Sequence, residues 1–239
     1  MINNIAVIGS AGAIGSAFTL HFSQYYPNAS IHAFSRDGSA VNHENVISHL
    51  IDYDSEASIE QAALLSSKKA PLDMVIVATG ILHNDTLQPE KSLKDMSEEK
   101  FNTLFKVNTI VPALVAKHFT SKLNKKHQSL FAVLSARVGS ISDNQLGGWY
   151  AYRASKAALN MIIKTTAIEI KRQNEKAVIV GLHPGTVDSN LSKPFQANVP
   201  ESKLFTPEYS VSKMTNVLEG LNSDDSGRCF AWDGTEIHP

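Results

Sequence analysis

A tyrosine and a lysine four residues apart, Tyr152 and Lys156, are the residues of this chain best suited to proton transfer. In a helix this spacing places both side chains on one face. A phenol exchanges protons poorly at neutral pH because its usual pKa is about 10. A neighbouring ammonium stabilises the phenolate and lowers that pKa, so Tyr152 could exchange a proton with a substrate oxygen. The same spacing also occurs on helices without any chemical role, so the pair needs further support.

A glycine-rich turn near the N-terminus could bind phosphate. Gly9, Gly12 and Gly15 follow a short apolar run, Ile5–Ile8, and open a segment with helical periodicity. Glycine lets the backbone turn tightly and approach a diphosphate, whose charge is met by free N–H groups and by the helix dipole. A strand before the turn and a helix after it favour dinucleotide binding over a purely structural turn. The predicted contact residues are Gly9, Ser10, Gly12, Ala13, Ile14 and Gly15.

The choice between NAD and NADP is expected at the end of the second strand, about 20 residues beyond the glycines. There the chain reads Phe34-Ser35-Arg36-Asp37. A neutral serine beside an arginine can accept the 2′-phosphate of NADP, whereas the carboxylate of Asp37 leaves NAD possible. The pattern favours NADP. The alternative is a solvated Arg–Asp turn that does not contact a cofactor.

Short apolar runs and longer helical segments alternate along the chain and must position these residues. Most of the apolar runs are continuous, which is typical of parallel strands covered on both faces. The predicted strands are Ile5–Ile8, Ser30–Phe34, Val46–Ile51, Met74–Ala78, Leu130–Leu134, Val178–Leu182 and Cys229–Trp232. The predicted helices are Ala13–Tyr25, Ser55–Ser67, Glu98–Leu123, Ala151–Arg172 and Pro207–Leu221, the last with Thr206 as its N-cap. This order predicts an α/β fold, a single doubly wound parallel sheet with helices on both faces and its site beyond the carboxyl ends of the strands.

The composition is typical of a globular chain without a highly charged partner. Of its 239 residues, 43% are hydrophobic and 19% charged, and 22 Lys and Arg against 23 Asp and Glu give a net charge of −1. This balance excludes disorder and argues against nucleic acid or a membrane surface as a partner. Without a leader or a long apolar segment, we expect one domain, residues 1–239, in the cytoplasm. A single cysteine, Cys229, and histidines without ligand spacing predict no metal site.

The glycine-rich turn, the Tyr152–Lys156 pair and several smaller motifs stand in the order of the short-chain dehydrogenase/reductase family, and the chain resembles this family over essentially its whole length. The segments Ser135–Ile141 and Gly147–Asn160 look like the carbonyl-reductase-like branch that includes proteins labelled C-factor. The resemblance implies a Rossmann fold and NAD(P)-dependent reduction of a small carbonyl compound, or the reverse oxidation of an alcohol. It also implies a homodimer or homotetramer.

The resemblance assigns roles to individual residues. Tyr152 would donate the proton, and Lys156 would lower the pKa of Tyr152 and hold the nicotinamide ribose. Asn108 matches a helix asparagine that, in the family, holds a water of the proton relay through a local backbone distortion. The further cofactor contacts implied by the resemblance are Ala78, Thr79 and Gly80 after the fourth strand, Asp52 near the adenine, and Pro184, Gly185 and Val187 near the nicotinamide.

Two positions depart from the family pattern. Ala13 stands where the family commonly has its second glycine, with Gly12 one place earlier, which predicts altered loop contacts and retained binding. The family usually places its catalytic serine three residues before a glycine, and this chain has Ala136 there. Ser135 is then the predicted hydrogen-bond donor to the substrate oxygen, with Ser140 as the alternative.

Two further expectations concern the function and the substrate. The displaced serine and the likeness to C-factor proteins leave open an alternative, a cofactor-binding regulatory or signalling protein with little or no turnover. The segment Asn190–Phe205 is long and irregular and follows the Pro-Gly segment, so we expect it to border the substrate. Its apolar side chains fit either a hydrophobic substrate or docking onto the core.

Overall fold

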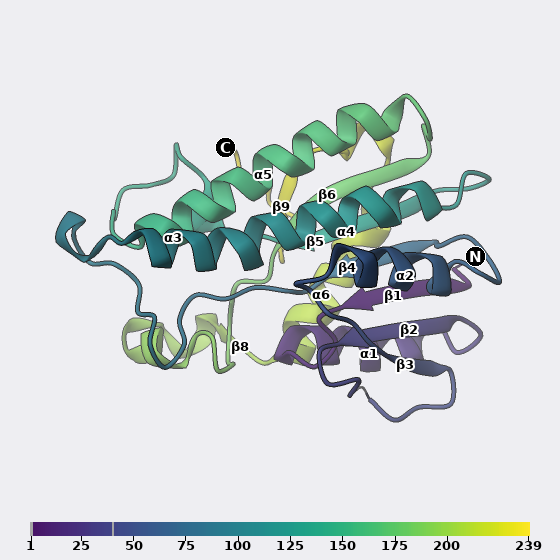
Figure 1. Cartoon of the computed structure of the whole chain (residues 1–239), viewed down its shortest axis with the longest axis horizontal. Helices are drawn as coiled ribbons and strands as arrows, with labels where there is room; N and C mark the ends of the chain where they lie inside the picture. Colours follow the sequence, from purple (N-terminus) through teal and green to yellow (C-terminus); the bar gives the residue numbers. More distant parts are fainter. Residues whose placement is uncertain (1, 40) are drawn as a thin grey trace.

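Within residues 2–39 and 41–239, which the computed structural model describes, seven strands from both halves of the chain form one parallel sheet (Figure 1). The order across the sheet is β3-β2-β1-β4-β5-β6-β9, and each neighbouring pair is parallel. The strands are β1 Asn4–Ile8, β2 Ser30–Ser35, β3 Val46–Leu50, β4 Met74–Val77, β5 Ser129–Leu134, β6 Ala177–His183 and β9 Cys229–Ala231. The predicted doubly wound sheet is confirmed.

Helices cover both faces of this sheet. They are α1 Ala13–Tyr25, α2 Glu56–Ser66, α3 Glu98–Phe105, α4 Val111–Phe119, α5 Tyr150–Lys171 and α6 Pro207–Gly220. Side chains of α2, α4 and α5 build a core on one face, and side chains of α1 and α6 build a core on the other. In Figure 1, α4 and α5 lie over the near face of the sheet. At the start of α6, the Thr206 hydroxyl accepts from the N–H of Tyr209, as predicted for its N-cap.

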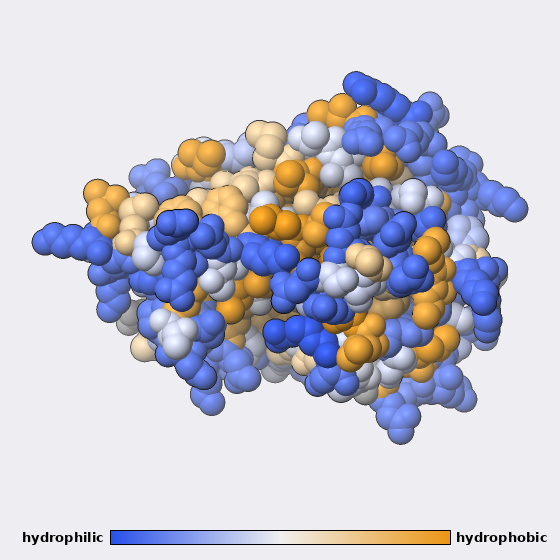
Figure 2. Space-filling view, in the orientation of Figure 1, coloured by the Kyte–Doolittle hydropathy of each residue, from blue (hydrophilic) through white to orange (hydrophobic). Residues whose placement is uncertain are grey.

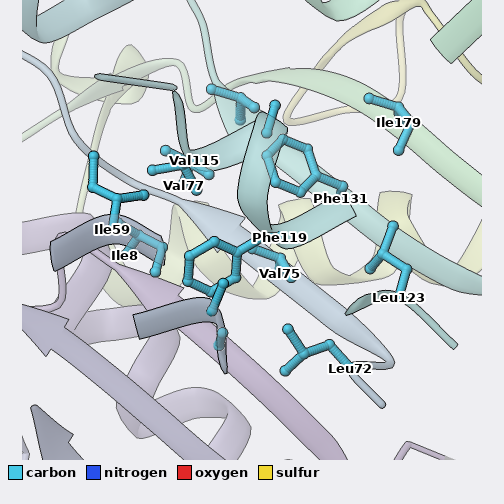
Figure 3. Packing of buried hydrophobic residues seen from close by; sticks show 14 of the residues in the cluster. Ile8, Ile59, Leu72, Val75, Val77, Val115, Phe119, Leu123, Phe131 and Ile179 are labelled. Carbon is cyan, nitrogen blue, oxygen red and sulfur yellow. The ribbon is translucent and has the colours of Figure 1, made fainter. Parts of the chain in front are cut away.

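Alternate residues of each strand face opposite helix layers. In β1, Ile8 packs in the core under α2, α4 and α5, whereas Val7 packs in the core over α1 and α6. Figure 3 shows the first of these cores. Phe119 of α4 lies near Ile8, and Phe131 of β5 belongs to the same cluster. The edge strand β3 is partly exposed and includes Ser48 and His49. The central strands β1, β4 and β5 are covered on both faces, and most of their successive residues are apolar. This is the physical reason that the strands read as continuous apolar runs.

The helix predicted over Glu98–Leu123 is interrupted. A π-helical segment, Lys106–Ile110, separates α3 from α4, and a 3₁₀ turn, Thr120–Lys122, ends the run. Pro112, near the start of α4, has no N–H to donate to the carbonyl of Asn108 one turn earlier. The α-helical hydrogen-bond pattern therefore cannot continue across this point, and single π turns of this kind are often found at functional sites.

The outer surface of the helix layer mixes hydrophilic and apolar side chains (Figure 2). Ile110, Met161 and Ile168 are among the large apolar side chains that are exposed. The homodimer or homotetramer stays a prediction. No helix in the described part of the chain is long and apolar enough to cross a membrane.

Candidate active site

The glycine-rich turn connects β1 to α1 at the carboxyl edge of the sheet. Gly9 has a φ of +90°, a conformation that side chains other than glycine rarely adopt. A Cβ on Gly15 would lie 2.1 Å from the carbonyl oxygen of Gly9, so this position also requires glycine. Gly12 has a φ of −73°, and the nearest atom to a Cβ there would be 3.5 Å away. Gly9 and Gly15 therefore shape the turn, whereas Gly12 leaves open space above it.

The turn offers hydrogen-bond donors to an anion. The backbone N–H of Ser16 donates to the carbonyl of Gly12. The N–H groups of the three residues between them come before this first helical hydrogen bond and have no partner within the helix. The hydroxyls of Ser10 and Thr79 are buried and have no hydrogen-bond partner among the described residues. Free N–H groups, unpaired hydroxyls and the positive end of the helix dipole fit the diphosphate of a dinucleotide.

A cavity of about 1260 Å³ runs along the carboxyl ends of the central strands from this turn to the segment after β6. It brings together most of the residues that the sequence predicted. The predicted site residues that line it are Gly12, Ala13, Ile14, Ala78, Thr79, Gly80, Ser135, Tyr152, Lys156, Pro184, Gly185 and Val187. Gly9, Ser10 and Gly15 lie beneath the turn. Like Gly9, Ser10 and Gly15, the predicted cofactor contacts Ser35, Arg36 and Asp52 lie outside the lining, and so does the predicted catalytic residue Asn108.

The residues predicted to choose the cofactor form a compact turn after β2. The hydroxyl of Ser35 is buried and lies 2.9 Å from Asp37 Oδ1 and 2.8 Å from the carbonyl oxygen of Ser39. Asp37 also accepts from the N–H and the hydroxyl of Ser39, which lowers the pKa of Asp37 to about 2. Arg36, between Ser35 and Asp37, is exposed. Asp52 lies beyond the end of β3, where its carboxylate accepts from the N–H of Asp54.

Tyr152 and Lys156 lie on the buried face of α5 and line the cavity. Lys156 Nζ is 6.0 Å from the centroid of the Tyr152 ring and donates to the carbonyl oxygen of Leu134 over 2.9 Å. Burial raises the pKa of Tyr152 to about 12 and lowers the pKa of Lys156 to about 8. The pKa of Tyr152 is therefore raised in this structure and not lowered as expected, because desolvation disfavours the charged form of each group and is the main cause of both shifts.

Asn108 lies in the π-helical segment, which is the local distortion that the resemblance implied. Its side chain accepts from the N–H of Ile81 over 2.8 Å and donates to the carbonyl of Ile81 over 2.9 Å. It also contacts the hydroxyl of Ser155 on α5 at 3.2 Å. A Cβ on Gly80 would lie 3.6 Å from Asn108 Oδ1 and 3.8 Å from Lys156 Nζ. Asn108 therefore joins the end of β4 to the helix that carries Tyr152.

The hydroxyl of Ser135 is used within the protein. Ser135 Oγ donates to Asn160 Oδ1 on α5 over 2.6 Å. A serine hydroxyl has one hydrogen, so in this arrangement it cannot also donate to a substrate. Ala136, the next residue, lines the cavity with a methyl group. Ser140 Oγ accepts from the N–H of Asp143 and, among the residues described, is not part of the lining.

Sequence reasoning missed Glu90, which fixes the start of α5. Gly147, Gly148 and Trp149 have φ values of 65°, 65° and 52°, so three successive residues adopt the left-handed conformation. The carbonyl of Glu90 accepts from the N–H of Trp149 over 2.6 Å, and its fully buried carboxylate accepts from the N–H of Ala151 over 3.3 Å. Glu90 lies in an irregular segment without periodicity, so no sequence pattern indicated this contact.

The segment Asn190–Phe205 borders the cavity, and that it borders the substrate stays a prediction. It contains the 3₁₀ turns Lys193–Asn198 and Glu201–Lys203, and its strand β8 Leu204–Phe205 pairs with β7 Thr186–Val187. The Phe195 ring lies 5.0 Å from Trp149 and 5.5 Å from His83 between ring centroids. Phe195 therefore closes one side of the cavity with an apolar surface.

Comparisons with known proteins agree with this geometry. Residues 3–200 match the family model for short chain dehydrogenases. The chain is 34% identical over 146 residues to C-signal of Myxococcus xanthus, covering 61% of this chain and 82% of that protein. It is 30% identical over 186 residues to 1-hydroxy-2-glutathionyl-2-methyl-3-butene dehydrogenase of Rhodococcus sp. (strain AD45), covering 77% and 76%. Its fold resembles the NADPH-bound carbonyl reductase from chicken fatty liver, with a TM-score of 0.85, 23% identity and coverage of 100% and 94%.

Proposed function

Because this chain belongs to the short-chain dehydrogenase/reductase family of oxidoreductases, we propose that it reduces a carbonyl compound with NADPH. The observation that carries the proposal is the placement of Tyr152 and Lys156 on the wall of a cavity that begins at a phosphate-binding turn. The test is loss of NADPH absorbance during incubation with a panel of aldehydes, ketones and diketones. Absence of turnover across the panel would contradict the proposal.

Tyr152 is the proposed proton donor. When bound, NADPH would supply the hydride that adds to the carbonyl carbon. With a pKa of about 12, the Tyr152 hydroxyl is protonated at neutral pH, and it can donate to the substrate oxygen only if the phenolate that it leaves is stabilised. The phenolate left behind is stabilised by the ammonium of Lys156, at 6.0 Å from the ring centroid. The carbonyl of Asn108, which Pro112 leaves without its helical donor, is the proposed site for the water that returns the proton.

We propose that Ser135 positions α5 rather than donating to the substrate. Ser135→Ala is expected to lower kcat by less than about 10-fold, because the hydroxyl that it removes bonds Asn160. Ala136→Ser, which puts a hydroxyl on the cavity wall, is expected to raise kcat by about 10-fold. Steady-state kinetics on both variants test the assignment. A collapse of kcat in Ser135→Ala with an unchanged melting temperature would return the donor role to Ser135.

Arg36 is the proposed partner of the 2′-phosphate of NADP. Arg36→Ala is expected to raise the Kd of NADPH by about 10-fold and to leave the Kd of NADH unchanged, because only NADPH carries the phosphate. Titration calorimetry measures both constants. The matched control is Arg172→Ala, since Arg172 is an exposed arginine at the far end of α5. Equal affinity of the Arg36 variant and the wild type for NADPH would refute this role.

A second candidate function is regulation or signalling through cofactor binding. The similarity to C-signal favours it. This function predicts NADPH binding without turnover and a biological effect that survives loss of the Tyr152 hydroxyl. The buried Tyr152–Lys156 pair favours the enzyme, because keeping a lysine at 3% exposure is costly unless the charge has a use.

A further inference from the structure

His183, the last residue of β6, lies at the cavity without a role in the chemistry described so far. It follows Leu182, which pairs with Leu134 of β5, so the strand register places His183 beside Ser135 at the carboxyl edge of the sheet. Of its two ring nitrogens, Nδ1 is sealed from solvent and has no hydrogen-bond partner among the described residues, whereas Nε2 is not sealed. The ring is therefore oriented with one nitrogen toward the protein and the other toward accessible space.

The surroundings of His183 determine the charge of its ring. The pKa of His183 is lowered to about 4, mainly by burial and to a smaller extent by the positive charge of Arg137. The negative charge of Asp233 opposes this shift. The imidazole is thus neutral at pH 7 and has one N–H. A hydrogen on Nδ1 would be a buried donor without an acceptor, which is costly. The Nε2–H tautomer instead leaves Nδ1 as a buried acceptor without a donor, and it is the tautomer that presents a donor to the cavity.

The neighbouring β5 end supplies no hydroxyl for the same purpose. Ser135 donates to Asn160, and Ala136 presents a methyl group. Arg137, which also lines the cavity, adds a second N–H donor close to His183. Nη1 of Arg137 lies 3.4 Å from Oδ2 of Asp143, and this carboxylate offsets part of the positive charge of the guanidinium. This corner of the cavity, made of His183 and Arg137 and called the donor corner below, therefore offers hydrogen-bond donors to a ligand.

We infer that the donor corner binds a second oxygen of the substrate through the Nε2–H of His183, so that the substrate is a carbonyl compound with another oxygen acceptor close to the reacting carbonyl. The inference rests on the proposed carbonyl reductase function and deepens it. A vicinal diketone, a keto ester and a keto acid share this chemistry. Trp149, Leu191 and Phe195 line the cavity as well, so an apolar substituent on the substrate has a matching surface.

The first test compares two ketones that differ by one carbonyl. Phenylpropanedione has the second oxygen, and propiophenone lacks it. His183→Leu is expected to lower kcat/KM for the diketone by about 10-fold to 100-fold, and to change kcat/KM for propiophenone by less than about 3-fold. His183→Gln, which keeps an N–H, is expected to recover part of the loss. An equal loss on both substrates, or no loss on either, would overturn the inference.

A matched variant at the same cavity separates this role from a general disturbance. His83 also lines the cavity, but its Nε2 lies 3.1 Å from the carbonyl oxygens of Asn190 and Leu191. His83→Leu is therefore expected to affect the diketone and propiophenone alike. Arg137→Leu distinguishes the candidate substrate classes: a larger loss for phenylglyoxylate than for its methyl ester assigns a carboxylate to the corner, and equal small losses assign a neutral oxygen.

A measurement without turnover keeps this inference separate from the proposed function. In protein labelled with ¹⁵N, the imidazole spectrum of His183 is expected to show the neutral Nε2–H tautomer at pH 7. Calorimetry with protein loaded with NADP⁺, which cannot deliver a hydride, is expected to show phenylpropanedione binding at least about 10-fold more tightly than propiophenone, and equal binding in His183→Leu. If neither ketone is reduced, the proposed function fails. The Nδ1–H tautomer, or equal binding by the wild type, refutes the donor corner.

Discussion

Tyr152→Phe is expected to lower kcat for carbonyl reduction by about 100-fold to 10,000-fold, the usual contribution of a positioned proton donor. The substitution removes one oxygen and keeps the ring, which packs against Trp149 with centroids 6.1 Å apart. The fold and the affinity for NADPH should therefore be preserved, and the loss should appear in kcat. Single-turnover kinetics at saturating NADPH measure the effect on the chemical step.

Tyr150 provides the matched control for this substitution. It is the first residue of α5 and lies two residues before Tyr152, and it does not line the cavity. Tyr150→Phe removes the same atom from the same helix and is expected to keep kcat within about 3-fold of the wild type, in keeping with the small effect of most changes away from a site. A Tyr152→Phe protein that turned over as fast as Tyr150→Phe would exclude Tyr152 as the proton donor.

Gly15→Ala is expected to destabilise the protein by on the order of 3 kcal/mol and to weaken NADPH binding by more than about 10-fold. The added methyl would lie 2.1 Å from the carbonyl oxygen of Gly9, so α1 and the turn before it must move apart. That movement displaces the N–H groups that would bind the diphosphate. Urea denaturation and NADPH titration measure the two effects.

Gly12→Ala separates the two roles of the turn. Its methyl would meet the nearest protein atom at 3.5 Å, and its φ of −73° suits any residue, so the free energy of unfolding should change little. Gly12 lines the cavity, however, and a methyl there would occupy the space through which a diphosphate approaches. We expect a loss of NADPH affinity without a loss of stability. If the Gly15→Ala protein proves as stable as the Gly12→Ala protein, the close approach of position 15 to the Gly9 carbonyl does not require glycine there, and the prediction is wrong.

The sequence predicted the sheet almost completely. Strand bounds agree within one or two residues because strands covered on both faces are mostly apolar along their length, and this signal is local. The helix predicted over Glu98–Leu123 shows where that reasoning ends. Its apolar periodicity continues through the π-helical segment, since periodicity reports which face is buried and not which carbonyl each N–H binds. Pro112 was the available signal for the break.

The candidate site divides in the same way. The spacing of Tyr152 and Lys156 within one helix placed both on one face, and the structure agrees. The pKa of Tyr152 was predicted in the wrong direction, because the spacing reports the neighbouring ammonium and not the burial that outweighs it. The prediction for Ser35 failed for a similar reason. Its hydroxyl is buried against Asp37 and Ser39 and is not free to bind a phosphate.

By itself, the sequence determined the strands of the sheet, the glycine-rich turn and the Tyr152–Lys156 pair, because each depends on residues close together in the chain. Only the tertiary structure decided that the Ser135 hydroxyl serves Asn160, that Glu90 fixes the start of α5, and that His183 faces the cavity. Burial and hydrogen-bond partners are set by segments far apart in sequence, which meet only when the strands align their carboxyl ends along one edge of the sheet.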